Sequence, residues 1–242
     1  MFNFMGSGSA VWELLSQADV MTKFVLFGLF LTSVFCFSIV LYKYLFFRRE
    51  LKALKELGKK ARGVSRFEDY LALRKEFQDS LGGHFLDRGL AELKKILQKN
   101  LRDEELGEGE FEKDKVCLHE DDMAHFDEIL NQTIDQVLVE SESYLPVLGT
   151  SAAVAPLVGL FGTVWGLIHA FINISREKSA DIIAIAPGIA EALMTTLAGL
   201  IVAIPAMIFF HFLSNKIRNL ERNLIGISDH FFNSVRRTFL KK

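Results

Sequence analysis

Three long apolar runs constrain this sequence more than any other feature, because each is long enough to cross a lipid bilayer as a helix. They cover residues 24–47, 147–174 and 182–213, and their charged side chains are Lys43 and Glu191 alone. An α-helix rises about 1.5 Å per residue, so about 20 apolar residues span a hydrocarbon core of about 30 Å. Hydrophobic residues make up 50% of the 242-residue chain, which further favours an all-α membrane protein with three transmembrane helices.

The charges beside these runs predict the topology. Seven Lys or Arg residues lie between positions 48 and 62, after the first run, whereas Lys23 is the one basic residue before it. More basic residues follow the third run, so the positive-inside rule places the N-terminus outside and the C-terminus in the cytoplasm. The predicted segments are an outer N-terminal segment (1–23), the first spanning helix (24–47), a cytoplasmic helical domain (48–146), the second spanning helix (147–174), an outer loop (175–181), the third spanning helix (182–213) and a cytoplasmic C-terminal helix (214–242).

The first and second spans have different surfaces. Bulky residues cover the first, which predicts a lipid-facing helix whose Lys43 extends to the membrane interface. Small residues repeat at three- and four-residue steps along the second span, and Gly199 adds one on the third. Such stripes let membrane helices approach closely, so we expect these positions to pack helix against helix. The stripe on the second span comprises Ala155, Gly159, Gly162, Gly166 and Ala170.

The remaining chain reads as largely helical and water-exposed. Gly82–Gly83 predicts a turn between two helices, and the twelve acidic residues within 101–128 predict an exposed loop leading into a helix from about Asp121. The C-terminal helix carries one apolar stripe, which we expect to pack on neighbouring helices. Together with the small-residue stripes, it argues for a ring of several copies. The stripe comprises Leu213, Ile217, Leu220, Leu224, Ile227, Phe231 and Val235.

Glu191 is the strongest functional candidate. An ionisable side chain at membrane depth costs about 2.5–3.5 kcal/mol on insertion scales, so such residues usually face a bundle interior or a water-filled path. At helical rise, Glu191 lies about 14 Å, and Thr163 about 17 Å, from the outer end of its own span. Thr195 shares the face of Glu191 one turn on, whereas Thr196 is rotated away, in line with Ala192 and Gly199, so the pore-facing hydroxyl stays open. A buried structural acid, bonded to a neighbouring hydroxyl, is the alternative role for Glu191.

Other kinds of chemistry receive little support. The net charge of −2 gives no electrostatic basis for nucleic-acid binding. The sequence has no Gly-rich phosphate loop, nucleophile elbow or paired catalytic carboxylates, so we expect neither an enzyme nor a cofactor. Cys36 and Cys117 fall in different compartments on the predicted topology, which argues against a disulfide. The Cys, His and Asp residues between Cys117 and His125 match no standard metal-ligand spacing, so no metal site is expected.

Two segments carry a resemblance to a known family. They read LFGTVWGLIHAF at residues 160–171 and APGIAEAL at residues 186–193, with AIPA following at 203–206. Together they closely resemble the TolQ/ExbB/MotA proton-channel family over roughly residues 145–225. Within that family, the segment WGLIHAF is more similar to the TolQ branch than to the ExbB branch. The positions that match the family's functional residues are Thr163, Glu191 and Thr196, whereas Thr195 replaces a residue that is commonly small and apolar.

The resemblance implies a multi-pass stator of the bacterial inner membrane that uses the proton motive force. Five copies would surround the transmembrane helices of two copies of a TolR- or ExbD-like partner, whose helix carries the proton-bearing Asp. For a TolQ-like subunit, the energy would pass to a TolA-like protein and support outer-membrane integrity and constriction at cell division. Two alternatives stay open: an ExbB-like subunit that energises TonB-dependent uptake, and a structural membrane scaffold without ion flow.

Overall fold

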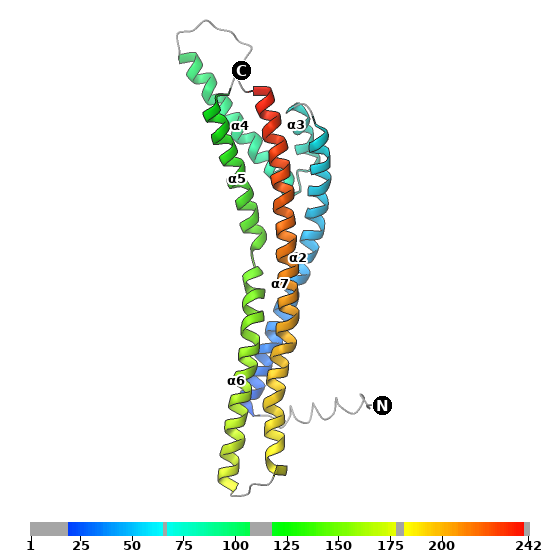
Figure 1. Ribbon diagram of the computed structural model, residues 1–242, viewed down its shortest axis with the longest axis vertical. Coiled ribbons are helices and arrows are strands. Elements are labelled where there is room, and N and C mark those ends of the chain that lie inside the picture. Colours follow the sequence, from blue (N-terminus) through cyan, green and yellow to red (C-terminus); the bar gives the residue numbers. More distant parts are fainter. Residues whose placement is uncertain (1–18, 65–66, 107–117, 178–181, 240–242) are drawn as a thin grey trace. The chain divides into compact units, whose positions relative to one another are not determined.

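The computed structural model describes residues 19–64, 67–106, 118–177 and 182–239, and this part of the chain contains six α-helices and no strand (Figure 1). The predicted N-terminal segment up to residue 18, residues 178–181 of the predicted outer loop, and residues 107–117 of the acidic stretch lie outside the described residues. The helices are α2 (Val20–Gly63), α3 (Phe67–Glu76), α4 (Leu81–Leu106), α5 (Glu120–Glu142), α6 (Leu145–Glu177) and α7 (Ile182–Phe239).

Three of these helices are long and apolar enough to cross a membrane, which confirms the predicted number of spans. They are α2, the stretch Leu145–Ile172 of α6 and the stretch Ala186–Phe239 of α7. Both α2 and α7 continue well past the predicted ends of their spans, to Gly63 and Phe239. A helix satisfies its backbone hydrogen bonds internally in lipid and in water alike, so it need not end where the apolar run ends.

The helices form two compact units. The first, which we call the spanning unit, comprises Met1–Lys43 and Tyr144–Leu213, and the second, the amphipathic unit, comprises Tyr44–Ser143 and Ser214–Lys242. The spanning unit therefore holds the start of α2, all of α6 and the first part of α7. The amphipathic unit holds α3, α4, α5 and the remainders of α2 and α7.

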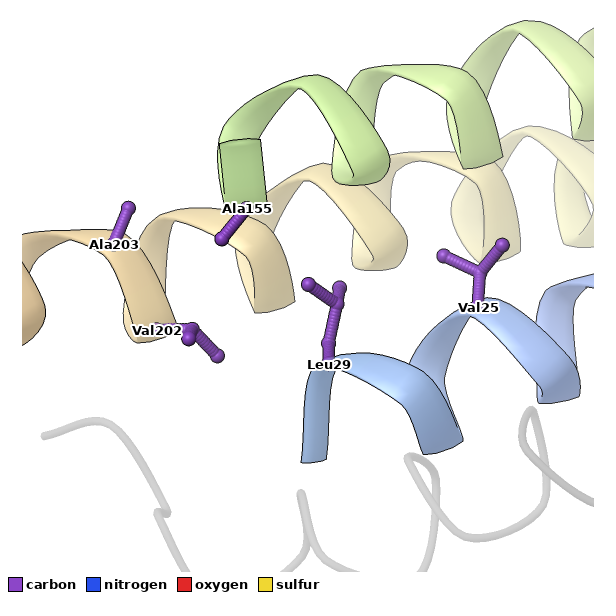
Figure 2. Packing of buried hydrophobic residues seen from close by; sticks show 5 residues of the cluster. All are labelled: Val25, Leu29, Ala155, Val202 and Ala203. Carbon is purple, nitrogen blue, oxygen red and sulfur yellow. The ribbon is translucent and has the colours of Figure 1, made fainter. Parts of the chain in front are cut away.

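A small apolar core joins three helices of the spanning unit (Figure 2). Val25 and Leu29 of α2 meet Ala155 of α6 and the adjacent residues Val202 and Ala203 of α7, and all five are buried. Two of the five are alanines, so α6 and α7 present little side-chain volume here, and the branched side chains of α2 fill the space against them. This contact fixes the start of α2 against the α6–α7 pair that carries the candidate site.

The opposite face of α2 carries large apolar side chains, in agreement with the predicted lipid-facing helix. Phe24 is 70% exposed and Phe30 is 62% exposed. The Lys43 side chain was predicted to extend to the membrane interface, but the structure shows it buried within the protein. The Lys43 ammonium lies 5.9 Å from the centroid of the Tyr144 ring. A cation over an aromatic face is attracted by the ring's quadrupole, which offsets part of the cost of removing the charge from water.

The amphipathic unit is organised around Phe231 of α7. Its ring is buried, and the ring centroids of Phe67, Tyr70 and Phe126 lie 6.4, 5.1 and 5.8 Å from the Phe231 centroid. These rings come from α3, α5 and α7, so one cluster ties three helices together. Burial raises the pKa of the Tyr70 hydroxyl to about 12, so this side chain stays neutral within the cluster.

The apolar stripe of the C-terminal helix is covered by the chain itself, which corrects one argument for a ring of copies. Every predicted stripe residue, from Leu213 to Val235, is at most 4% exposed. Within the amphipathic unit, Ile227 lies against Gly58 of α2, and Phe231 lies against Gly89 of α4. A stripe that is already buried within one chain cannot join copies, so any assembly must use other faces.

Gly82–Gly83 do not form the predicted turn, because the chain turns earlier, at residues 77–80, and both glycines lie in the first turn of α4. Ser80 caps this helix, since its Oγ accepts a hydrogen bond from the Gly83 N–H at 3.2 Å. The Glu50 carboxylate of α2 accepts the first N–H of α4 at 2.9 Å, and its charge is favourable at a helix N-terminus. A Cβ on Gly83 would lie 1.9 Å from a backbone oxygen, so close approach explains the glycine better than turn geometry does.

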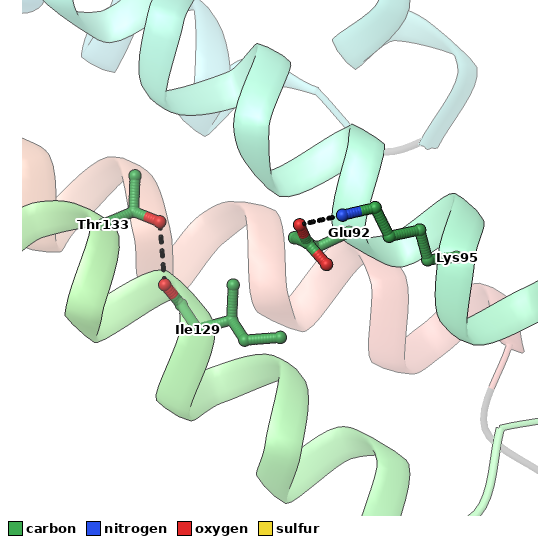
Figure 3. Close-up of polar contacts among 4 residues, drawn as sticks. All are labelled: Glu92, Lys95, Ile129 and Thr133. Atoms are coloured by element: carbon green, nitrogen blue, oxygen red, sulfur yellow. Dashed lines mark hydrogen bonds and ion pairs between the residues drawn. The ribbon is translucent and has the colours of Figure 1, made fainter.

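Two polar contacts on α4 and α5 each join neighbours on one helix (Figure 3). Lys95 of α4 donates to the Glu92 carboxylate at 2.6 Å, and the Thr133 hydroxyl of α5 donates to the Ile129 carbonyl at 2.8 Å. Contacts of this kind join neighbours on one helix, and an exposed pair adds a few tenths of a kcal/mol at most, about 0.2–0.5. Contacts between the helices of this unit come from the apolar core and from polar pairs such as Arg88 of α4 with Gln136 of α5.

The helix expected from about Asp121 begins at Glu120, and Asp122 explains where it starts. The Asp122 carboxylate accepts hydrogen bonds from the His119 N–H at 3.0 Å and from the Asn100 side-chain amide at 2.7 Å. It therefore closes the first turn of α5 and ties that turn to α4. Cys117, which was weighed with these residues as a metal ligand, lies outside the described residues.

We expect Phe231→Ala to destabilise the amphipathic unit by about 3–5 kcal/mol, because it removes a fully buried ring and leaves a cavity. The matched control is Ile225→Ala on the same helix, whose side chain is 43% exposed. That substitution should cost well under about 1 kcal/mol, since surface changes rarely exceed about 0.5 kcal/mol. Thermal unfolding of the purified full chain in detergent measures both. Equal losses for the two variants would contradict the central position of Phe231.

Candidate functional site

The site is built on an unusually close approach of α6 and α7. A Cβ on Gly159 would lie 2.7 Å from the Thr195 carbonyl oxygen, and a Cβ on Gly199 would lie 2.6 Å from the Ala155 carbonyl oxygen. Each distance is shorter than real Cβ contacts allow, so these positions require glycine. The predicted small-residue stripe therefore lies in the contact between α6 and α7 of the same chain.

Thr195 fills the notch that these glycines leave. It is 0% exposed, and a Cβ on Gly162 would lie 2.7 Å from the Thr195 Cβ. The Thr195 hydroxyl lies 2.7 Å from the Ala192 carbonyl on its own helix and 3.0 Å from the Gly159 carbonyl on α6. Both acceptors are backbone groups of the contact, so this hydroxyl is satisfied within the packing of the two helices.

Thr163 and Thr196 meet across the same contact. Their hydroxyl oxygens are 3.0 Å apart, and the Thr163 hydroxyl also lies 2.7 Å from the Leu160 carbonyl. A hydroxyl has one proton to donate and two lone pairs that accept. If Thr163 donates to Leu160, then Thr196 is the donor in the pair, and rotation of both groups reverses the direction. The pair is thus an interhelical polar bridge in which either hydroxyl can be the donor.

Glu191 precedes Thr196 by five residues on α7 and lies next to the start of α2. The backbone N–H of Asp19 acts as a hydrogen-bond donor to the Glu191 carboxylate, and the charges of Asp19 and Lys23 both act on it. The Trp165 indole N–H of α6 donates to the Asp19 carboxylate at 3.2 Å. Three helices therefore meet around Glu191, which is partly exposed rather than sealed in the protein.

The contact with Asp19 gives a second way to locate Glu191 along the membrane normal, relative to α2 as well as to α7. Counted along α7, the residue lies about 14 Å from the helix start at Ile182, at 1.5 Å per residue. Counted against α2, it lies level with the first turn, because Asp19 immediately precedes that helix. The ends of α6 and α7 accordingly extend beyond the start of α2 (Figure 1). Glu191 is central on its own helix and close to the end of its neighbour.

The structure brings together the predicted residues Thr163 and Thr196, places Glu191 beside Asp19 at the start of α2, and sets Thr195 inside the helix contact. Sequence reasoning did not identify Asp19 as a site residue. Asp19 falls within the predicted outer segment 1–23, and nothing in the local pattern shows that it reaches Trp165 of α6, more than 140 positions away. The indirect signal was an Asp and a Lys one turn apart beside an apolar run.

We expect Gly199→Ala to disrupt the site by forcing α6 and α7 apart. The added methyl group would meet backbone atoms that cannot rotate away, and overpacking of this kind costs about 1–3 kcal/mol. Gly226→Ala is the matched control, because it lies on the same helix with nothing within 4 Å of the added Cβ. Thermal unfolding in detergent should show a lower melting temperature for Gly199→Ala and an unchanged or higher one for Gly226→Ala. The reverse order would refute the close contact.

Comparison with known proteins is consistent with this geometry. The family model described as the MotA/TolQ/ExbB proton channel family matches residues 84–225, a stretch that contains both threonines of the bridge and Glu191. The Tol-Pal system protein TolQ of Haemophilus influenzae is 40% identical over 108 residues, which are 45% of this chain and 47% of that protein. The match to this relative therefore covers less than half of its length.

Two ExbB proteins are similar to different extents. The biopolymer transport protein ExbB of Salmonella typhimurium is 29% identical over 222 residues, covering 92% of this chain and 84% of that protein. The ExbB of Neisseria gonorrhoeae is 40% identical over 95 residues, which are 39% of this chain and 43% of that protein. Since the family model spans more than half of the chain and includes the α6–α7 site, this protein belongs to the MotA/TolQ/ExbB proton channel family.

Proposed function

We propose that this protein is a stator subunit of the bacterial inner membrane that couples the proton motive force to mechanical work. The observation that carries the proposal is Glu191, an acid on the same spanning helix as Thr196, whose hydroxyl forms a bridge with that of Thr163. A carboxylate and reversible hydroxyls can stabilise water and pass protons along a path. No enzymatic reaction is assigned to the site, whose work would be transport.

The path needs more than one chain. Two helices cannot enclose a channel, so we propose a ring of five copies, with the N-terminus outside and the C-terminus in the cytoplasm. The apolar faces of α6 and α7 are accessible to other copies, because Leu157 is 63% exposed and Leu193 is 62% exposed within the single chain. In this arrangement, Glu191 and the bridge form bands around a central axis. The axis would hold the transmembrane helices of two copies of a TolR- or ExbD-like partner, whose Asp would carry the proton.

The proposed output is work on the cell envelope through TolA. This assignment follows the TolQ-like character of the segment around Trp165 and His169, and the 40% identity to a TolQ protein over its matched region. In that role, the subunit would maintain outer-membrane integrity and assist constriction at cell division.

A second candidate output is uptake powered through a TonB-like protein. It is favoured by the length of the ExbB match, which covers 92% of this chain. Complementation separates the two. We expect the full chain, expressed with its own single-span partner, to restore detergent resistance in a strain that lacks TolQ. Restored growth on iron-siderophore in a strain that lacks ExbB, without restored detergent resistance, would instead assign the ExbB role.

A further inference from the structure

The start of α2 adds a cluster of ionisable groups to the site that the proposed proton path does not use. Asp19 immediately precedes α2 and Lys23 lies on it, Trp165 and His169 come from α6, and Glu191 comes from α7. The Trp165 indole donates to Asp19 at 3.2 Å, and the Trp165 and His169 rings are 5.9 Å apart between centroids. The positive charge of Lys23 acts on Glu191, and that of a protonated His169 acts on Asp19.

Asp19 differs from Glu191 in its access to water. It precedes the first residue of α2, so on the proposed topology it lies at the outer end of the first span. Glu191 lies level with the first turn of α2, where the Asp19 backbone N–H reaches its carboxylate, and burial desolvates Glu191 more than Asp19. Asp19 is therefore the acid that an incoming proton would meet first, and it stands beside the acid that lines the proposed path.

We propose that Asp19 is a proton-relay residue through which Glu191 exchanges protons with the outer aqueous phase. This inference rests on the proposed function and on the proposed orientation. It goes beyond them by naming the residue through which protons enter the path from the outer side. Asp19 lies outside the region that the family model covers, so its role does not follow from the family match.

The relay is a balanced proton transfer. A hydronium ion gives its proton to the Asp19 carboxylate and leaves as water. The Asp19 carboxyl then gives the proton to the Glu191 carboxylate and becomes charged again, ready for the next proton. The Trp165 hydrogen bond holds the pKa of Asp19 below its usual range, so Asp19 releases its proton readily rather than storing it. A fixed carboxylate at the mouth also concentrates protons near the path by its field.

Asp19→Asn tests the relay, because the amide oxygen still accepts the Trp165 N–H while the ionisable proton is lost. The full chain, co-purified with its TolR- or ExbD-like partner, is reconstituted in liposomes, and proton flux is followed with an internal pH dye. At an outer pH of about 7.5, where protons are scarce, we expect the flux to fall by about tenfold, the lower end of steering effects. At an outer pH of about 5.5, protons are about 100-fold more abundant, and we expect the flux to recover.

The controls separate a relay from a structural contact. Asp19→Glu keeps the charge and should keep most of the flux at both pH values. Unchanged flux in Asp19→Asn, or an equal loss at both pH values, would overturn the relay. If Asp19→Asn does not assemble, Trp165→Phe replaces it: loss of the N–H should raise the pKa of Asp19 and move the pH of half-maximal flux upward, and an unmoved profile would overturn the relay.

Glu191→Gln in the same liposomes separates this inference from the proposed function. Normal flux in Glu191→Gln would remove the proposed function itself. Abolished flux in Glu191→Gln, together with wild-type flux in Asp19→Asn at both pH values, would remove the relay alone and leave the proposed function intact.

Discussion

Replacing Glu191 by glutamine is expected to stop proton flux while the protein still inserts and assembles. Glutamine has nearly the same shape and can still accept the Asp19 N–H, but it cannot take up and release a proton. Loss of a positioned proton-transfer group typically costs about 100-fold or more in rate. Because Glu191 is the one acid within the predicted spans, no other carboxylate of these helices can take its place.

Two measurements check this prediction. Co-purification of the partner reports assembly, and dye-detected flux in liposomes reports conduction. Glu191→Asp is the matched control, since it keeps the carboxyl group on a shorter side chain and should retain partial flux. A structural scaffold makes the opposite prediction, with Glu191→Gln fully functional in restoring detergent resistance. That result would move Glu191 to the alternative role of a buried structural acid.

Glu191→Gln also tests how the protein offsets the free-energy cost of a charged carboxylate at this position. Glu191 has a backbone donor and the cation of Lys23 near it, so the cost of desolvating its charged form is partly offset within the protein. Removing the charge should therefore not destabilise the protein strongly. A large stability loss in Glu191→Gln would show that the charge serves mainly to hold α2 against α7.

The spanning helices could be predicted from sequence because the constraint behind them is strong. Lipid offers no hydrogen-bond partners, so a long uncharged run such as 147–174 has one common solution, the helix. The small-residue stripe could also be predicted from sequence, because residues at three- and four-residue steps fall on one helical face whatever helix packs against it. Periodicity could not predict which helix packs against this stripe. Gly159 faces Thr195 of its own chain, which the spacing on α6 alone does not specify.

The errors come from the same limit. An apolar stripe at the C-terminal helix signals burial, but burial within one chain and burial between copies leave the same pattern in sequence. Phe231 is covered by Phe67 and Phe126 of its own chain, so the stripe supplies no argument for a ring. Lys43 was expected at an interface because a lone lysine near a helix end usually reaches water, whereas the Tyr144 ring provides a local alternative. Both outcomes depend on residues distant in sequence.

The two adjacent threonines show how a tertiary contact decides between local alternatives. On an isolated helix, Thr195 shares the face of Glu191 and would be the preferred partner for it. Packing against the glycines of α6 places Thr195 at 0% exposure and turns Thr196 toward Thr163. The structure thus assigns Thr195 to helix packing and Thr196 to the hydroxyl bridge, a distinction that substitution can test.

Thr196→Val is therefore expected to lower proton flux strongly, by about tenfold or more, because it removes one hydroxyl of the bridge without changing the volume of the side chain. Thr195→Val should leave flux close to wild type and instead reduce stability by about 0.6–1.7 kcal/mol, the range for an interhelical hydrogen bond in a membrane. Thr196→Ser keeps the hydroxyl and should restore most of the flux. Dye-detected flux and thermal unfolding of the same preparations separate the two effects. The opposite result would be wild-type flux in Thr196→Val together with no flux in a fully assembled Thr195→Val. It would reverse the assignment and make the buried Thr195 hydroxyl the functional one.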